Sequence, residues 1–215
     1  NGKLFRAHSL VNIKENLMAL PELIQQVVSE QDYLDGEMAS DIKHEYIGGK
    51  VFAMAGASES HNLISGNIFR KLGNHLEQQK SICKIFSSDM KVQVASSDQN
   101  YFYPDVMVVC DSDDNESEYY KKSPVLIVEV LSKSTIRQDT TTKMMAYINI
   151  PTLQEYVMIA QDSCRIEVLR KNEHWKPAYY YLGDDIAFES LNITLTVSEI
   201  YYQIENEDML EYMEG

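Results

Sequence analysis

The segment PVLIVEVL, from Pro124 to Leu131, constrains the fold of this chain more than any other feature. Seven of its eight residues are apolar, and the eighth is Glu129. A continuous apolar run of this length is typical of a central β-strand that is covered on both faces. An unpaired buried carboxylate costs free energy, so Glu129 needs a partner. Two interpretations remain open at this stage: a structural ion pair with a Lys or Arg, or a metal ligand or acid/base group.

A second carboxylate, Asp105, follows Pro104 at the start of another apolar run, DVMVVC. The 24 residues that separate Asp105 from Glu129 allow two neighbouring strands joined by an acidic loop. Asp105 alone is more typical of a strand end or turn. Two carboxylates on adjacent strands can share Mg²⁺, which prefers a few carboxylate oxygens together with waters and substrate phosphates. Such a metal stabilises a phosphate under attack.

Helices and strands are predicted to alternate around these two strands. Ser29 and Asp32 have capping-box spacing, which indicates the start of a helix, and Gly48-Gly49 predicts a β-hairpin. An amphipathic helix follows, with Ser58 as its candidate N-cap. Further strands are expected at 81–87, 90–95 (alternating, with one face in water), 155–160, 164–170 and 177–182, and a helix at 135–148. The fold class is therefore α/β (α+β), with a mixed β-sheet flanked by helices.

The net charge of −14 disfavours a nucleic-acid partner at first sight, but the acidity is local. Asp184–Gly215 contains nine acids and no Lys or Arg, and Asp111–Glu118 contains five more acids. Elsewhere acids and bases are equal in number, and no basic stripe favours tight nonspecific binding to a nucleic-acid backbone. No apolar run approaches the ~20 residues of a membrane helix, and no secretory signal is evident. We therefore expect no membrane partner.

The three cysteines, Cys83, Cys110 and Cys164, match no zinc-binding pattern. Cys110 and Cys164 lie in or beside apolar segments, so buried and inert thiols are expected. Free thiols suit a reducing compartment, and we expect a bacterial, cytoplasmic protein.

The Asp–Glu pair resembles that of the PD-(D/E)xK nuclease superfamily, and the chain more closely resembles the Uma-two family of putative restriction endonucleases. The resemblance extends over about Ser29 to Ile204 and rests on five blocks, in order YLDGEMASDIKHEYIGGKVFAMAGASESHN, SDMKV, YFYPDVMVVCD, VLIVEVLSKST and DTTTKMMAYINIPTLQEYVMI. We therefore divide the chain into an N-terminal extension (1–28), a nuclease-like domain (29–204) and an acidic C-terminal tail (205–215). A short amphipathic helix interrupted near Pro21 is expected in the extension.

The resemblance implies a restriction-endonuclease-like core, αβββαβ, that cleaves phosphodiester bonds with a divalent metal. By position, Asp105 and Glu129 match the metal-binding acids, and Glu45 matches an upstream acid of the family, a metal-shell or orienting residue. The superfamily pattern places a lysine two residues after the second acid, where this chain has Leu131. Lys143, from the following helix, is the candidate replacement.

Asp139, Lys143 and Tyr147 are four residues apart and so line one face of that helix. If the helix packs over the sheet, Lys143 points at the metal site. A surface ion pair between Asp139 and Lys143 is the alternative. His61 also falls in a matching block, but an ordinary helix residue is the favoured interpretation, so we leave it outside the site.

Two hypotheses follow. The first is a Mg²⁺-dependent endonuclease (Mn²⁺ as an alternative ion) that hydrolyses DNA, in which Asp105 and Glu129 hold the metal and Glu45 supports it. Lys143 orients the attacking water or stabilises the developing charge. The second is a catalytically weak or inactive nuclease-fold module for binding or assembly, which the net acidity and Leu131 favour. The 14 tyrosines favour a homodimer, because tyrosine is enriched at protein interfaces.

Overall fold

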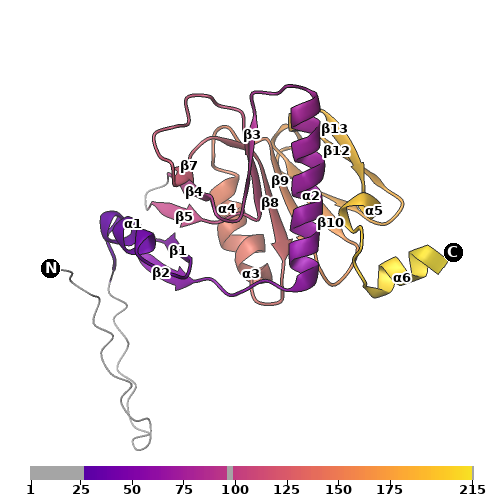
Figure 1. The fold of residues 1–215 in the computed structure, drawn as a ribbon, viewed down its shortest axis with the longest axis horizontal. Coiled ribbons are helices and arrows are strands. Elements are labelled where there is room, and N and C mark those ends of the chain that lie inside the picture. Colours follow the sequence, from indigo (N-terminus) through magenta and orange to yellow (C-terminus); the bar gives the residue numbers. More distant parts are fainter. Residues whose placement is uncertain (1–26, 96–98, 215) are drawn as a thin grey trace, which may run out of the picture.

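A six-stranded mixed sheet forms the centre of the computed structural model, which describes residues 27–95 and 99–214 (Figure 1). The strand order is β11-β10-β9-β8-β6-β3. Its strands are β3 (Lys84–Ser87), β6 (Val106–Val109), β8 (Pro124–Leu131), β9 (Glu155–Ala160), β10 (Ile166–Arg170) and β11 (Pro177–Tyr180). β8 and β9 are parallel, and the other pairs are antiparallel. β6 and β8 are therefore inner neighbours, as their apolar sequences predict.

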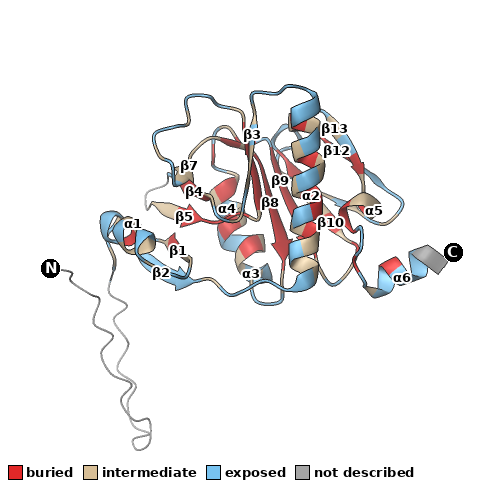
Figure 2. Cartoon of the chain, viewed as in Figure 1, coloured by how far each residue is buried: buried red, intermediate tan, exposed pale blue. Residues whose placement is uncertain are grey.

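Helix α2 (Glu59–Gln78) covers one face of this sheet (Figure 1). The predicted N-cap is confirmed, since the Ser58 side chain accepts a hydrogen bond from the His61 backbone. The apolar stripe of α2, which includes Ile64, Ile68 and Leu72, packs in one core cluster with Val128. Alternation along β8 places Ile127, Glu129 and Leu131 on the opposite face. Figure 2 shows that the strands behind α2 are buried.

The segment expected as one helix over 135–148 covers that opposite face in three parts. They are α3 (Ile136–Gln138), a π-helix η1 (Asp139–Lys143) and α4 (Met144–Tyr147). Tyr147 is buried in a second core cluster with Ile127 and Leu131. π-helical turns inside α-helices are rare and frequently occur at functional sites. Here the π turn contains two buried charged residues, Asp139 and Lys143.

A second, five-stranded sheet of order β2-β1-β5-β4-β7 lies beside the first (Figure 1). Its strands are β1 (His44–Ile47), β2 (Lys50–Ala53), β4 (Lys91–Val94), β5 (Asn100–Phe102) and β7 (Tyr120–Lys121). The predicted hairpin is confirmed: Gly48 and Gly49, with φ of 54° and 80°, form the two-residue turn between β1 and β2. Helix α1 (Glu30–Met38) starts at Ser29, as the capping pattern predicts. The chain passes from β5 directly into β6, so the two sheets meet near residue 105.

The C-terminal part adds a small hairpin and two helices. β12 (Asp185–Phe188) pairs with β13 (Ile193–Thr196), and α5 (Val197–Ile200) and α6 (Glu207–Glu214) follow. Short 3₁₀ turns, η2 (Lys171–Glu173) and η3 (Glu189–Leu191), connect neighbouring strands. Among the described helices, none is both long and apolar enough to cross a membrane. The short helix expected in the N-terminal extension lies outside the described residues, and the proposed domain boundaries stay predictions.

Two sequence predictions are wrong. All four residues of β4 are buried, so the face with Lys91 and Gln93, which was expected to be in water, is covered: Lys91 donates to the Tyr103 hydroxyl, and Gln93 donates to the Tyr101 hydroxyl and to Glu30 of α1. Cys83 and Cys110 form a disulfide, with a Cα–Cα distance of 3.9 Å. They extend the β3–β6 ladder by one step beyond the pair Lys84–Val109, so they face each other across the strands. Cys164 is a buried free thiol, as predicted.

Candidate active site

The two strand carboxylates, Asp105 and Glu129, are neighbours at one end of the β6–β8 ladder. The last pair of the ladder joins Val106 to Val128, so Asp105 stands opposite Glu129 one step further on. The prediction that these acids lie on adjacent strands is confirmed. Glu129 is only 3% exposed, whereas Asp105 is half-buried at the start of its strand.

Lys143 places its ammonium group among three buried carboxylates. Its Nζ lies 2.9 Å from Oε1 of Glu45, 3.1 Å from Oε1 of Glu129 and 3.2 Å from Oδ1 of Asp139. Tyr147 donates a hydrogen bond of 2.9 Å to the same Oε1 of Glu129. The partner of the carboxylate in the strand is therefore the lysine predicted from the following helix. The alternative prediction, that Asp139 and Lys143 form an ion pair at the surface, is wrong, because both side chains are buried.

Glu45 reaches this cluster from β1, in the second sheet. Gln138 donates a 2.6 Å hydrogen bond to Oε2 of Glu45, and the backbone N–H of Tyr103 approaches Oε1 at 3.5 Å. The cluster thus joins a strand of each sheet to the π-helical segment. Its polar groups fix the position of that segment over the main sheet, together with the Tyr156 hydroxyl, which donates to the Asp139 carbonyl.

Negative charge exceeds positive charge in this cluster. Three carboxylates share one ammonium, and Asp105 adds a fourth acid beside Glu129. Oδ1 of Asp139 is buried and makes no hydrogen bond with any described residue, although it faces Lys143. Within the described part of the chain, no group hydrogen-bonds Oε2 of Glu129, since both of its partners use Oε1. The site therefore has carboxylate oxygens available and a deficit of positive charge.

The pKa values of the buried groups reflect this imbalance. Burial raises the pKa of Glu129 well above its ordinary value; Lys143 opposes the shift, while Asp139, Asp105 and Glu45 add to it. Burial by itself lowers the pKa of Lys143, but the surrounding carboxylates outweigh it and hold that pKa well above its ordinary value. Burial, and then the charge of Glu129, also raises the pKa of Tyr147. The shifts thus favour the charged form of Lys143 and the neutral, hydrogen-bond-donating form of Tyr147.

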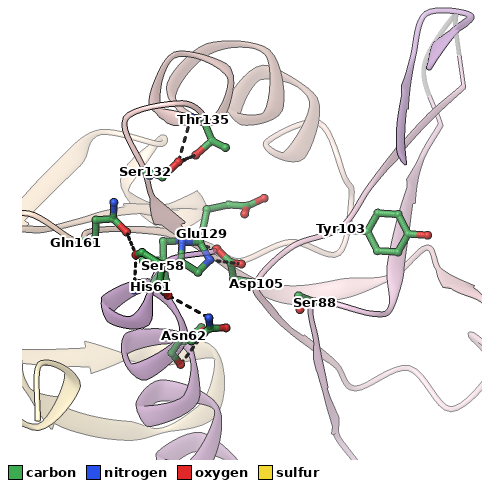
Figure 3. Close-up of polar contacts among 12 residues, drawn as sticks. Ser58, His61, Asn62, Ser88, Tyr103, Asp105, Glu129, Ser132, Thr135 and Gln161 are labelled. Atoms are coloured by element: carbon green, nitrogen blue, oxygen red, sulfur yellow. Dashed lines mark hydrogen bonds and ion pairs between the residues drawn. The ribbon is translucent and has the colours of Figure 1, made fainter. Parts of the chain in front are cut away.

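Asp105 is held by two hydrogen bonds from different elements. Its Oδ2 accepts from the backbone N–H of Val130 at 2.7 Å, and its Oδ1 lies 2.8 Å from Nε2 of His61. Figure 3 shows His61 reaching from the first turn of α2 to Asp105. Sequence reasoning left His61 outside the site because nothing local in SESHN indicates which strand end the helix start will contact.

Of the predicted site residues, Lys143 contacts both Glu45 and Glu129, and Asp105 stands opposite Glu129 at the end of the ladder. Their catalytic roles stay predictions. Asp139 and Tyr147 were predicted to share a helical face with Lys143. The Asp139–Lys143 ion pair was expected only as a surface alternative, and the contact of Tyr147 with Glu129 was not foreseen. Among the residues that the structure describes, no three His, Cys, Asp or Glu side chains form a ready-made metal cage.

Comparison with known proteins assigns the chain to a family. The Uma2 family model, described as "Putative restriction endonuclease", matches residues 30–198. The chain belongs to the Uma2 family. All four predicted site residues lie within the matched region, as do Asp139 and His61.

Two relatives from Synechocystis sp. (strain ATCC 27184 / PCC 6803 / Kazusa) support this assignment. "Uncharacterized protein slr1290" is 36% identical over 176 residues, which cover 81% of this chain and 91% of the relative. "Uncharacterized protein sll1609" is 36% identical over 148 residues, which cover 68% of this chain and 82% of the relative.

The fold also matches a solved structure. A crystal structure of a putative nuclease belonging to DUF820 from Anabaena variabilis ATCC 29413 superposes with a TM-score of 0.66 at 15% identity. The match covers 77% of this chain and 93% of that protein. This Uma2-family chain therefore has a nuclease-like fold, and family and fold together support a nuclease activity.

Proposed function

We propose that this Uma2-family protein is a divalent-metal-dependent endonuclease that hydrolyses DNA phosphodiester bonds. The observation that supports it most is the environment of Glu129. Among the described residues, this carboxylate receives hydrogen bonds from Lys143 and Tyr147 on one oxygen and none on the other, and it stands opposite Asp105. In a purely structural ion pair, both oxygens of a carboxylate as buried as Glu129 would be expected to have hydrogen-bond partners.

The residues fit a magnesium ion held by few protein ligands. Mg²⁺ usually keeps several waters and binds through one or two carboxylates and the phosphates of its substrate. Asp105 and Glu129 are the two acids that would hold it, and the excess of carboxylates supplies the electrostatic attraction. Mn²⁺ accepts the same oxygen ligands. When bound, the metal would polarise the phosphate and lower the pKa of a coordinated water.

Lys143 acts as a fixed positive charge and hydrogen-bond donor in this proposal. Because its pKa lies well above the ordinary value, its Nζ keeps its protons and does not act as a general base. It therefore orients the attacking water or stabilises the charge that develops on the phosphate. Glu45 and Asp139 hold the ammonium in place, and Tyr147 fixes the orientation of the Glu129 carboxylate.

Nicking of supercoiled plasmid tests the proposal. We expect wild-type protein to nick DNA with Mg²⁺ or Mn²⁺ and to lose activity in a chelator. Glu129→Ala should abolish nicking, and Lys143→Ala should lower its rate by about 10²–10³-fold, the usual effect of removing one transition-state donor. The matched controls are Glu199→Ala and Lys71→Ala, which break a partly exposed ion pair of 2.6 Å on α2 and α5. They should nick at the wild-type rate.

Two observations favour the alternative of an inactive binding module. The lysine is enclosed by three acids, and no complete metal cage exists among the described residues. A wild-type protein that binds DNA but leaves plasmid intact, with either ion and with single-stranded and RNA substrates, would establish that alternative. Loss of nicking by Glu129→Ala alone would keep the metal site and assign Lys143 a structural role. The homodimer expected from the tyrosine content stays a prediction.

A further inference from the structure

His61 lies where it can control the orientation of Asp105. It occupies the first turn of α2, and its backbone N–H donates to Oγ of the N-cap, Ser58, at 3.2 Å. The Ser58 hydroxyl in turn donates to Oε1 of Gln161, at 2.9 Å, directly after β9. Figure 3 shows this connection between the helix start and the end of the sheet. The helix cap and the sheet together set the position of the imidazole.

Asp105 depends on side-chain contacts for its orientation because it precedes β6 and lies outside the ladder. Val130 holds one of its oxygens and His61 the other. An ionised carboxylate only accepts hydrogen bonds, so Nε2 of His61 must carry the hydrogen of this contact. With one donor on each oxygen the carboxylate cannot rotate freely, yet each oxygen keeps a second lone pair.

We infer that His61 is a positioning residue for Asp105, which it orients to bind the divalent metal; this rests on the proposed function. Within the described residues, the imidazole makes one hydrogen bond, and it goes to Asp105. Hydrogen-bonding partners of metal ligands typically contribute 10–100-fold to metal affinity. Both side chains are 14% exposed, so water can reach Asp105 if the imidazole is removed and can replace its fixed donor with a mobile one.

Calorimetric titration of the full chain with Mn²⁺ tests this inference. His61→Ala should weaken Mn²⁺ binding by about 10–100-fold. His61→Gln should restore most of the affinity, since a glutamine amide can donate from nearly the same position as Nε2 without a titratable ring. His75→Ala is the matched control: His75 lies on the same helix, is also half-buried, and its Nε2 contacts the Leu191 carbonyl at 3.0 Å. It should bind Mn²⁺ like wild type, and thermal unfolding should confirm that each variant is folded.

The possible results separate this inference from the proposed function. Equal Mn²⁺ affinity in wild type and His61→Ala would overturn the positioning role and leave the metal site intact. His61→Gln as weak as His61→Ala would also overturn it, because donation alone would then be insufficient. A wild-type protein that binds no Mn²⁺ would overturn both the proposed metal site and the role of His61.

Discussion

Two buried glutamates on neighbouring strands, Glu155 on β9 and Glu129 on β8, differ in how their charge is matched. Glu155 is 2% exposed and pairs across the ladder with Arg170. Its two oxygens accept four hydrogen bonds, from Arg170 Nε, the backbone N–H groups of Glu189 and Ser190, and the Ser190 hydroxyl. Arg170 also donates to the Tyr180 hydroxyl and the Ala187 carbonyl. This pair is satisfied.

Glu129 is buried to the same degree, but its surroundings are unbalanced. Within the described part of the chain, both of its hydrogen bonds fall on one oxygen, and its lysine is shared with two other buried acids. In the same sheet, Glu155 therefore forms a structural ion pair with matched hydrogen bonds, whereas Glu129 on the next strand belongs to a cluster with excess negative charge. A buried charge indicates function when its partners leave it incompletely matched, and not because it is buried.

The largest expected effect is on folding, at the satisfied pair. Glu155→Ala leaves Arg170 buried without its closest acid, and breaking a buried pair from one side typically costs about 3–5 kcal/mol of unfolding free energy. The control is Glu173→Ala, which removes a 47% exposed carboxylate 3.7 Å from the same arginine. It should change stability by less than about 0.5 kcal/mol. Urea titrations followed by circular dichroism measure the unfolding free energy of both variants. Similar losses in the two would contradict a structural role for the Glu155–Arg170 pair.

The second effect is stabilisation by metal, which should occur at the unbalanced site alone. A ligand that binds only the native state stabilises it by about 2.7 kcal/mol at a hundredfold excess over Kd. Wild-type protein should gain about this amount with Mn²⁺, measured as the increase in unfolding free energy, and Glu129→Ala should gain nothing. Glu173→Ala, at the satisfied pair, should gain as much as wild type. An equal gain in Glu129→Ala would place the metal elsewhere.

Local sequence patterns predicted most of the fold, because they depend on periodicity and capping. The strands around Asp105 and Glu129, the cap at Ser58 and the Gly48-Gly49 turn all follow from residues close in sequence. The contact between Lys143 and Glu129 joins residues on different elements. Its prediction required the four-residue spacing along one helix together with the family resemblance.

Long-range contacts account for what the sequence did not predict. The disulfide depends on β3 pairing with β6, which nothing local to Cys83 or Cys110 reveals. Because those two thiols are bonded, the cysteines do not support a reducing compartment, and the cytoplasmic location stays a prediction. Lys91 is buried against Tyr103, whose hydroxyl donates to Glu37 of α1, and the role inferred for His61 depends on where a helix start meets a distant strand.

The smallest expected effect is on the pH dependence of the unfolding free energy, which should differ between a carboxylate with matched partners and one without. The pKa of Glu129 is raised in the folded protein, first by burial, so its ionised form is less favourable folded than unfolded. Wild-type protein should therefore lose stability as the pH rises from the ordinary glutamate range through the raised pKa. Glu129→Gln cannot ionise but can still accept from Tyr147, so it should escape this loss. In metal-free buffer at neutral pH it should be more stable than wild type by about 1 kcal/mol, while binding no Mn²⁺.

Glu199 gives a control of opposite sign for this experiment. A hydrogen bond from Lys71, followed by one from the Thr196 backbone, lowers the pKa of Glu199, so its ionised form stabilises the fold. Glu199→Gln should lower stability at neutral pH, and the difference from wild type should shrink as the pH falls through the lowered pKa. Unfolding free energies at pH 5, 7 and 8.5 would thus show the two variants diverging in opposite directions from wild type. If Glu129→Gln were instead less stable than wild type throughout, the carboxylate of Glu129 would be a structural partner of Lys143, equivalent to Glu155, and the site would not be poised for a second cation.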